Sequence, residues 1–350
     1  MFSTRILTLG LVAAWSAQAA VYPSASHPIL EAFTENFVVE PPSGNPLKPE
    51  CLRRRGIDLI VLDAGHDDSE LSRRSEAKRC RTCPDEFLRP LIHEGHANQA
   101  VAWMAFDLML KDPSLNDAER TELRGMVRFT RLPGELNYGE YEKALGYTDR
   151  LNGPITSNTV NRVEHVNHMM AYHRRVADRT EDVTSRTLMQ SIHANSSGYY
   201  NAADYLWVMR PQNITDNAWS YLRSLAAGFA SEMPPYFMGE KGDSEEVRRL
   251  KDAVRPTYVA ERTRLDHYDG TRMLGPLVGN AQTIRALSEG FFMDGKAGEL
   301  VYRELSDPAQ AKSLRFNREG REIASYAVSD LYVLYARSLV KGISNQFGCR

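Results

Sequence analysis

The sequence predicts an α/β fold in which a mixed, largely parallel twisted sheet carries helices on both faces. Short apolar runs have the length of buried strands, and longer apolar or amphipathic segments lie between them. Several of the short runs end at polar residues, which is typical of the carboxyl ends of parallel strands. Strands that alternate with helices in this way indicate a single domain with insertions, here from residue 51 to residue 350.

The first half of this domain contributes two predicted strands and one predicted helix. Residues 57–62 (IDLIVL) predict a buried strand that ends at Asp63-Ala64-Gly65, and the polar, basic segment 67–92 predicts a loop. Residues 98–110 (NQAVAWMAFDLML) are apolar and long enough for a packed helix, and 126–130 (MVRFT) suit a short strand. A parallel strand pair joined by a helix is therefore expected between residues 57 and 130.

The second half repeats this alternation. Buried strands are predicted at 188–192 (LMQSI), 205–209 (YLWVM) and 283–287 (TIRAL), of which the first ends at His193 and the last at Ser288-Glu289-Gly290. Helices are predicted at 160–178, 218–230 and 322–340, the last an amphipathic closing helix, and 244–267 is predicted to be a charged helical segment. His66, His193 and Glu289 consequently fall at the carboxyl ends of predicted strands.

Composition excludes several classes of protein. Among the 350 residues, 43 are Lys or Arg and 45 are Asp or Glu, which gives a net charge of −2 and argues against a nucleic-acid binder. Hydrophobic residues make up 42% and charged residues 25%, as in ordinary globular proteins, so a disordered chain or a small disulfide scaffold is not expected.

The N-terminus has the features of a signal peptide. Arg5 precedes a ten-residue apolar run, and Ala17-Gln18-Ala19 matches a signal-peptidase site. Residues 1–19 are thus expected to be removed on export to the periplasm or the medium. Residues 20–50 contain six prolines and predict an extended Pro-rich leader, and no integral membrane segment is expected in the mature chain.

Export determines how the cysteines are interpreted. Cys51, Cys80, Cys83 and Cys349 include one Cys-x-x-Cys pair, which is a poor match to a zinc ribbon and lacks the context of a redox motif. In an oxidising compartment we expect two structural disulfides, with all three pairings open.

Three residues are candidates for a metal centre. Catalytic zinc takes three protein ligands, commonly His and an acidic residue, and leaves a fourth position for water. His66, Glu94 and His193 form such a set, although a lone histidine is more often structural. His93 and His96 flank Glu94 at the wrong spacing for a zinc-protease helix, so we interpret them as solvent-facing or as neighbours of a ligand. His165 and His168 are interpreted as part of a polar helix face.

Four motifs in order resemble the zinc-dependent N-acetylmuramoyl-L-alanine amidases of bacterial cell walls. They are IVLDAGH at 60–66, Glu94 with Asn98, SIHANSS at 191–197 and LSEGFF at 287–292. Phe129-Thr130-Arg131 and the pair Arg162 and Asn167 fit two further features of the family. The resemblance spans roughly residues 56–343, and it departs from the family at Ala64 and at Asp67-Asp68.

The resemblance implies a zinc hydrolase acting on peptidoglycan or muropeptides. His66, Glu94 and His193 would bind Zn²⁺, and Glu289 would be the catalytic proton carrier. Asn195 would bind substrate or shape its turn. Asp63 would orient a ligand histidine or have a structural role at the strand end.

Two other functions stay open at this stage. One is a non-catalytic cell-wall-binding protein on the same fold, and the other is a zinc peptidase that acts on muropeptides. The charged insertion near 210–270 is interpreted either as a lid or docking element for a protein activator or as an ordinary exposed helix.

Overall fold

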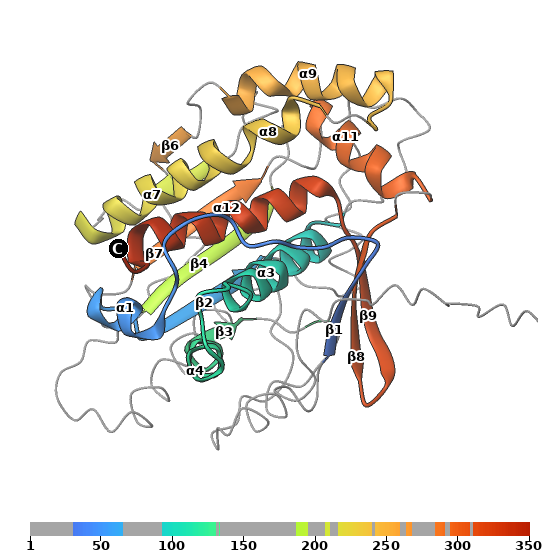
Figure 1. Ribbon diagram of the computed structural model, residues 1–350. Helices are drawn as coiled ribbons and strands as arrows, with labels where there is room; N and C mark the ends of the chain where they lie inside the picture. The colour runs from blue at the N-terminus through green and yellow to red at the C-terminus, as the bar shows by residue number, and fades with distance from the viewer. Residues whose placement is uncertain are drawn as a thin grey trace, which may run out of the picture.

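A six-stranded sheet forms the centre of the computed structural model (Figure 1). In spatial order its strands are β3 (Val127–Phe129), β2 (Leu59–Ala64), β4 (Thr187–Ala194), β7 (Ile284–Gly290), β5 (Trp207–Arg210) and β6 (Arg264–His267). The strands from β3 to β7 are parallel, β5 runs antiparallel to β7, and β6 is parallel to β5. The predicted mixed, largely parallel sheet is therefore confirmed.

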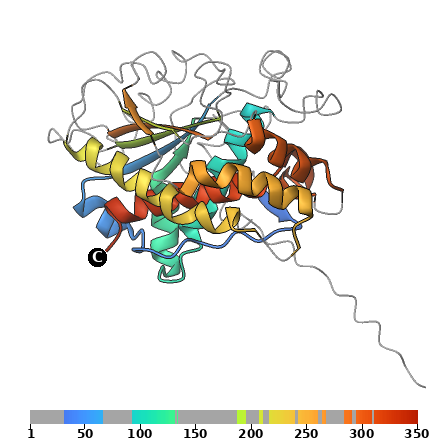
Figure 2. The same cartoon turned by 90° about the horizontal axis from the view of Figure 1, so that it is seen from above.

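The structure describes residues 31–65, 93–130, 133, 187–194, 207–210, 216–239, 242–259, 264–267, 284–290, 295–308 and 311–350. Three long helices lie on one face of the sheet, namely α3 (Glu94–Leu110), α7 (Asp216–Glu232) and α12 (Asp330–Phe347) (Figures 1 and 2). The predicted helix at 160–178 lies outside the described residues. Helices on the second face stay a prediction.

Strand β2 is buried along its whole length, as a central parallel strand should be. Successive side chains point to opposite faces of a sheet. Ile60, Leu62 and Ala64 belong to the helix-side core together with Ile192 of β4. Asp63 and His193 alternate with these residues and so belong to the opposite face. Asp63 and His193 are each the second-last residue of their strand, so these candidate site residues lie at the carboxyl ends of the apolar strands.

Helix α3 is almost entirely buried because apolar residues surround it on nearly all sides. Its Trp103 ring stacks on Phe129 of β3 with 4.3 Å between centroids, and it meets Phe316 edge-on at 5.1 Å. Phe316 belongs to a second sheet, so Trp103 joins the two sheets through one core.

The second sheet consists of β1 (Glu31–Glu35), β8 (Ser313–Arg318) and β9 (Arg321–Ala327), all antiparallel in the order β1-β8-β9. Two sequence-based expectations are corrected here. Part of the leader predicted to be irregular forms β1. The closing helix predicted at 322–340 begins only at Asp330, because the segment before it pairs with β8 as β9 across a turn at Glu319-Gly320, both with positive φ.

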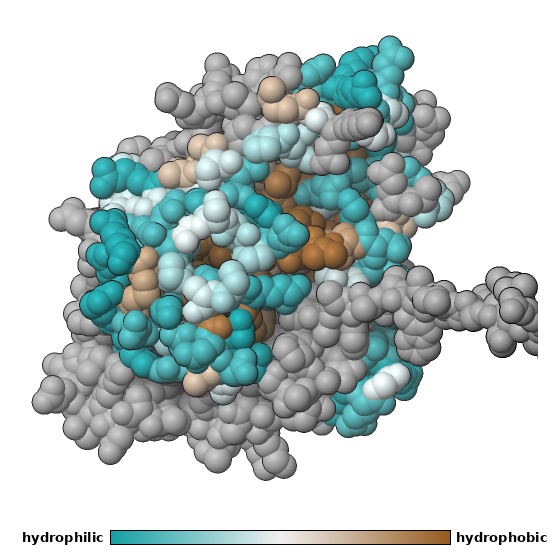
Figure 3. Space-filling view, in the orientation of Figure 1, coloured by the Kyte–Doolittle hydropathy of each residue, from teal (hydrophilic) through white to brown (hydrophobic). Residues whose placement is uncertain are grey.

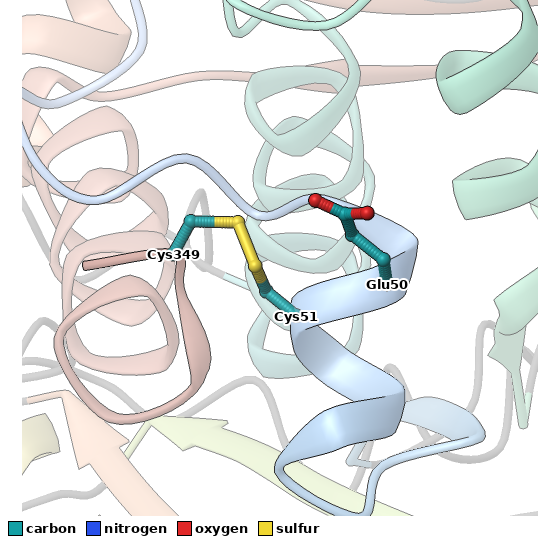
Figure 4. Close-up of side chains that lie close together, drawn as sticks. All are labelled: Glu50, Cys51 and Cys349. Atoms are coloured by element: carbon teal, nitrogen blue, oxygen red, sulfur yellow. A yellow bond between two sulfur atoms is a disulfide. The ribbon is translucent and has the colours of Figure 1, made fainter.

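The leader after β1 lies along α12 and is tied to it (Figure 1). Arg337 donates a hydrogen bond to the carbonyl of Glu40 at 2.8 Å, and Cys349 N–H donates to that of Pro46 at 2.9 Å. A disulfide joins Cys51 of α1 (Pro49–Arg54) to Cys349 after α12 (Figure 4). One of the two expected disulfides is therefore present, and Cys80 and Cys83 lie outside the described residues.

Helices α7 and α12 approach each other closely at two glycines. A Cβ atom on Gly228 would lie 2.6 Å from the carbonyl oxygen of Ser338, and one on Gly342 would lie 2.6 Å from the Cα of Leu225. No side chain fits at either position without a shift of the backbone. We call this contact the α7–α12 seam.

The remaining helices are α1, α4 (Asp117–Met126), α8 (Pro234–Phe237), α9 (Glu245–Val259) and α11 (Gly295–Ser306). Asn116 and Glu119 start α4 with a reciprocal capping box. The segment near 210–270 is not a peripheral insertion as a whole, because α7 is a core helix and Arg264–His267 form β6. Lys251 of the charged helix α9 is buried, and its ammonium lies 2.9 Å from Asp243 and 3.9 Å from the centre of the Tyr236 ring.

Hydrophilic residues cover most of the described part of the face seen in Figure 3, and hydrophobic ones gather near its middle. Val38 and Met238 are the large hydrophobic side chains that are strongly exposed in the described part of the chain. Within the same part, no helix combines the length and the apolar character needed to cross a bilayer.

Candidate active site at the carboxyl edge of the sheet

Strands β2, β4 and β7 bring the predicted site residues to one edge of the sheet. In the parallel ladder between β4 and β7, His193 and Glu289 are register partners. Gly65, just after β2, donates its N–H to the carbonyl of Ile192 at 2.9 Å and so continues the pairing of β2 with β4. The ends of three neighbouring strands therefore converge beside His193.

Glu94 reaches this edge from the first residue of α3. Its Oε1 lies 3.5 Å from Nδ1 of His193, and the two residues are only 3% and 4% exposed. Two donor atoms bound to one tetrahedral zinc ion lie about 3.4 Å apart, given ligand distances of roughly 2.0–2.2 Å. The spacing of Glu94 and His193 therefore fits a shared zinc ion.

Gly65 allows the His193 ring to take this position. A Cβ atom on Gly65 would lie 2.3 Å from Cε1 of His193 and 2.5 Å from Nε2, far inside van der Waals contact. Only a glycine leaves room for the imidazole here. His66, the next residue in the sequence, lies outside the described residues.

Asn98 fixes α3 relative to the end of β2. Its amide Nδ2 donates a hydrogen bond to the carbonyl of Gly65 at 3.1 Å, and the residue is buried. Because Asn98 lies one turn after Glu94, this bond also sets the distance of Glu94 from the strand end. The sequence resemblance includes Asn98, and the structure gives it this positioning contact.

Asp63 links three strands. Thr130, after β3, donates to Oδ1 at 2.7 Å, and Ser191 of β4 donates to Oδ2 at 2.5 Å. These bonds agree with the structural role that the sequence left open for Asp63. A role in orienting His66 stays a prediction.

A buried hydrogen-bond network supports the same strand ends from the helix side. Tyr221 of α7 donates to Oε1 of Gln190 at 2.8 Å, and Nε2 of Gln190 donates to Oγ of Ser288 at 2.9 Å. Tyr335 of α12 completes the network at Ser288. Burial raises the pKa of Tyr221, so its hydroxyl stays a neutral donor. Tyr335 falls within the amphipathic helix predicted at 322–340, and that pattern gives no sign of its polar contacts.

The two histidines that flank Glu94 in the sequence contact each other. The ring centroids of His93 and His96 lie 5.1 Å apart, and His96 lies 4.8 Å from the Tyr326 ring of β9. Both histidines are half-buried, which corrects the prediction of solvent-facing side chains and leaves the alternative of a place next to a ligand.

The predicted site is thus present in part among the described residues. The structure brings together Glu94 and His193, with Glu289 next to His193 on the neighbouring strand. His66, Asn195, His165 and His168 lie outside the described residues. In the part of the chain that is described, three ligand-type residues come within metal-binding distance only at Glu50, Cys51 and Cys349. Figure 4 shows that the two cysteines there form the disulfide, so this cluster is no metal site.

No protein-family model matches the chain, and no curated protein matches it. Among solved structures, the chain is similar to the N-acetylmuramyl-L-alanine amidase Ami1 from Mycobacterium smegmatis. The TM-score is 0.40 at 13% identity, and the match covers 83% of this chain and 98% of that chain. The function of the chain is inferred from the order of its sequence motifs and from the geometry of the site.

Proposed function

We propose that the protein is a zinc-dependent hydrolase that cleaves the amide bond between N-acetylmuramic acid and L-alanine in peptidoglycan. The observation that carries the proposal is the buried pair of Glu94 and His193, whose donor atoms lie 3.5 Å apart at the carboxyl edge of the sheet. The motif order in the sequence supports the same chemistry. Glu289 is next to this pair through its register with His193.

In the proposed reaction, His66, Glu94 and His193 hold the ion. When bound, zinc lowers the pKa of a water molecule to about 7 and polarises the substrate carbonyl. Glu289 accepts the proton of the attacking water and passes it to the amine of L-alanine as the C–N bond breaks. Asn195, two residues after His193 in the sequence, would bind the substrate or shape its turn. The one proton that Glu289 takes from water thereby ends on the amine of L-alanine, and the hydroxyl ends on the acyl carbon of the muramic acid side.

The proposal includes export, since peptidoglycan lies outside the cytoplasm. The disulfide between Cys51 and Cys349 supports an oxidising compartment. The predicted signal peptide at residues 1–19 would direct the chain there.

Digestion of purified sacculi by the purified protein tests the proposal directly. We expect soluble products with a newly exposed L-alanine amine. EDTA should abolish the activity and Zn²⁺ should restore it. A new amine at another residue would indicate a peptidase. Binding to sacculi without cleavage, by protein that takes up no zinc when Zn²⁺ is supplied, would indicate the cell-wall-binding alternative.

Two substitutions separate metal binding from proton transfer. His193→Ala should lose zinc and activity together. Glu289→Gln should keep zinc but lose activity by roughly 10²–10⁴-fold, because an amide cannot accept the proton. Glu245→Gln, at an exposed position of α9, is the matched control and should behave as the wild type. If Glu289→Gln cleaves sacculi at the wild-type rate, another carboxylate is the base.

A further inference from the structure

Tyr335 contacts the backbone of both strands that carry the proposed chemistry. Its hydroxyl lies 2.7 Å from the carbonyl oxygen of Ser288 and 3.3 Å from that of His193. Ser288 immediately precedes Glu289. One side chain of α12 therefore lies against the end of β4 at His193 and the end of β7 beside Glu289.

The direction of these bonds can be worked out from the number of protons. A tyrosine hydroxyl has one proton, which a three-centre hydrogen bond shares between the carbonyl of Ser288 at 2.7 Å and that of His193 at 3.3 Å. Oγ of Ser288 lies 2.8 Å from the hydroxyl of Tyr335 and already accepts an amide proton from Gln190. The hydroxyl of Ser288 keeps its own proton, for which the oxygen of Tyr335 and the carbonyl of Ser191 at 3.4 Å are the two acceptors.

This arrangement is costly to break because every member is buried. Tyr335, Ser288 and Gln190 each have no exposed surface. Removing the tyrosine hydroxyl would leave a buried carbonyl and a buried serine without this partner. The lost bonds cannot be replaced by bulk water without opening the core.

We propose that Tyr335 is a positioning residue that holds the carboxyl ends of β4 and β7 together and so keeps His193 and Glu289 at working distance. The inference rests on the proposed function for its catalytic meaning. The claim that Tyr335 holds the two strand ends does not depend on the proposed function, because in this arrangement Tyr335 acts through the backbone of the two strands and contacts neither the ion nor the substrate.

Tyr335→Phe tests this inference with three measurements on the full chain. We expect kcat on sacculus fragments to fall about tenfold, while KM and zinc content stay near wild-type values. Amide hydrogen exchange should become about tenfold faster at residues 193–194 and 288–290. A loss of packing alone would instead speed exchange throughout the core.

Tyr236→Phe is the matched control, since it also removes a buried tyrosine hydroxyl, which there donates to Glu304. It should lower stability without a selective change at 193–194 or 288–290. Tyr221→Phe, at the far end of the network, should speed exchange at the same amides by a smaller factor, and it replaces Tyr335→Phe if that variant does not fold.

The outcomes separate the two proposals. Unchanged exchange at these amides in Tyr335→Phe, or an equal change in Tyr236→Phe, would overturn the positioning role even in an active enzyme. If the wild type cleaves no sacculi, the proposed function fails, and selective exchange would still establish that Tyr335 holds the strand ends.

Discussion

The carboxyl edge of the sheet and the α7–α12 seam are held by different interactions. At the edge, buried polar groups hydrogen-bond to one another, as the two carboxylate oxygens of Asp63 do with Thr130 and Ser191. At the seam, Gly228 and Gly342 let two helices touch through their backbones. A buried hydrogen bond adds only about 1 kcal/mol net but fixes direction, whereas close packing is non-directional and stabilises the whole domain. The edge is therefore organised for position and the seam for stability.

One added methyl group at the carboxyl edge and one at the α7–α12 seam give the sharpest test of this difference between the two regions. Gly65→Ala should reduce activity on the order of 100-fold or more, because its Cβ would overlap the His193 ring and displace it. Zinc binding should weaken as well, while the unfolding midpoint changes little. Sacculus digestion, zinc content and denaturant unfolding measure the three effects.

Gly125→Ala is the control for this substitution, because the Cβ that it adds to α4 has no atom within 4 Å apart from its chain neighbours and the backbone of its own helix. It should leave activity and zinc content unchanged. Wild-type activity in Gly65→Ala would mean that His193 does not need its present position.

Asp107, near the C-terminal end of α3 and away from the carboxyl edge of the sheet, shows how a buried carboxylate affects stability. Burial raises the pKa of Asp107 to about 7 from its ordinary 3.8, despite the ion pair with Lys111 at 2.7 Å. The folded state then binds more protons than the unfolded state between these two values. Stability should fall as pH rises from 4 to 7, by at most about 4 kcal/mol, and level off above that range.

Asp107→Asn should remove this part of the pH dependence, as measured by the difference between its denaturation curves and those of the wild type at several pH values. Asp252→Asn, at an exposed position of α9, serves as the matched substitution and should leave the pH dependence as it is. Parallel curves for Asp107→Asn and the wild type would contradict the raised pKa.

The smallest expected effect is at the seam. Gly342→Ala should cost about 1–3 kcal/mol of unfolding free energy, since the new methyl group would press on the Cα of Leu225 and force the helices apart. Activity per folded molecule should stay near that of the wild type. A large loss of activity without a loss of stability would show that the seam also sets the geometry of the edge.

Much of the sheet was predictable because its strands are short apolar runs with polar ends. The run at 57–62 anticipates β2, and the run at 188–192 anticipates β4 up to His193. The apolar segment at 98–110 became α3, although Glu94 to Ala97 at its start were missed. These elements are local, so their patterns are present in neighbouring residues.

The parts that were missed depend on distant partners. Strand β1 pairs with β8 from the far end of the chain. Its own segment, residues 20–50, is rich in proline and so predicted an extended leader instead of a strand. Strand β9, just before α12, does not alternate between polar and apolar residues, and it forms through its pairing with β8. The hydrogen bonds of Tyr335 are made to residues 47 and 142 positions away, and no local pattern encodes them. Glu94 and His193 were grouped in advance from their residue types and the strand-end position of His193, and the resemblance to a family strengthened that grouping.

The disulfide also determines how the molecule would respond to mechanical load. Cys51 and Cys349 are 298 positions apart, so the bond closes most of the chain into a covalent ring. A pull between the two ends would pass through sulfur rather than through the hydrogen bonds of the sheet. The enclosed residues would not extend until a reductant cut the ring, although the leader segment that precedes Cys51 would peel from α12 first.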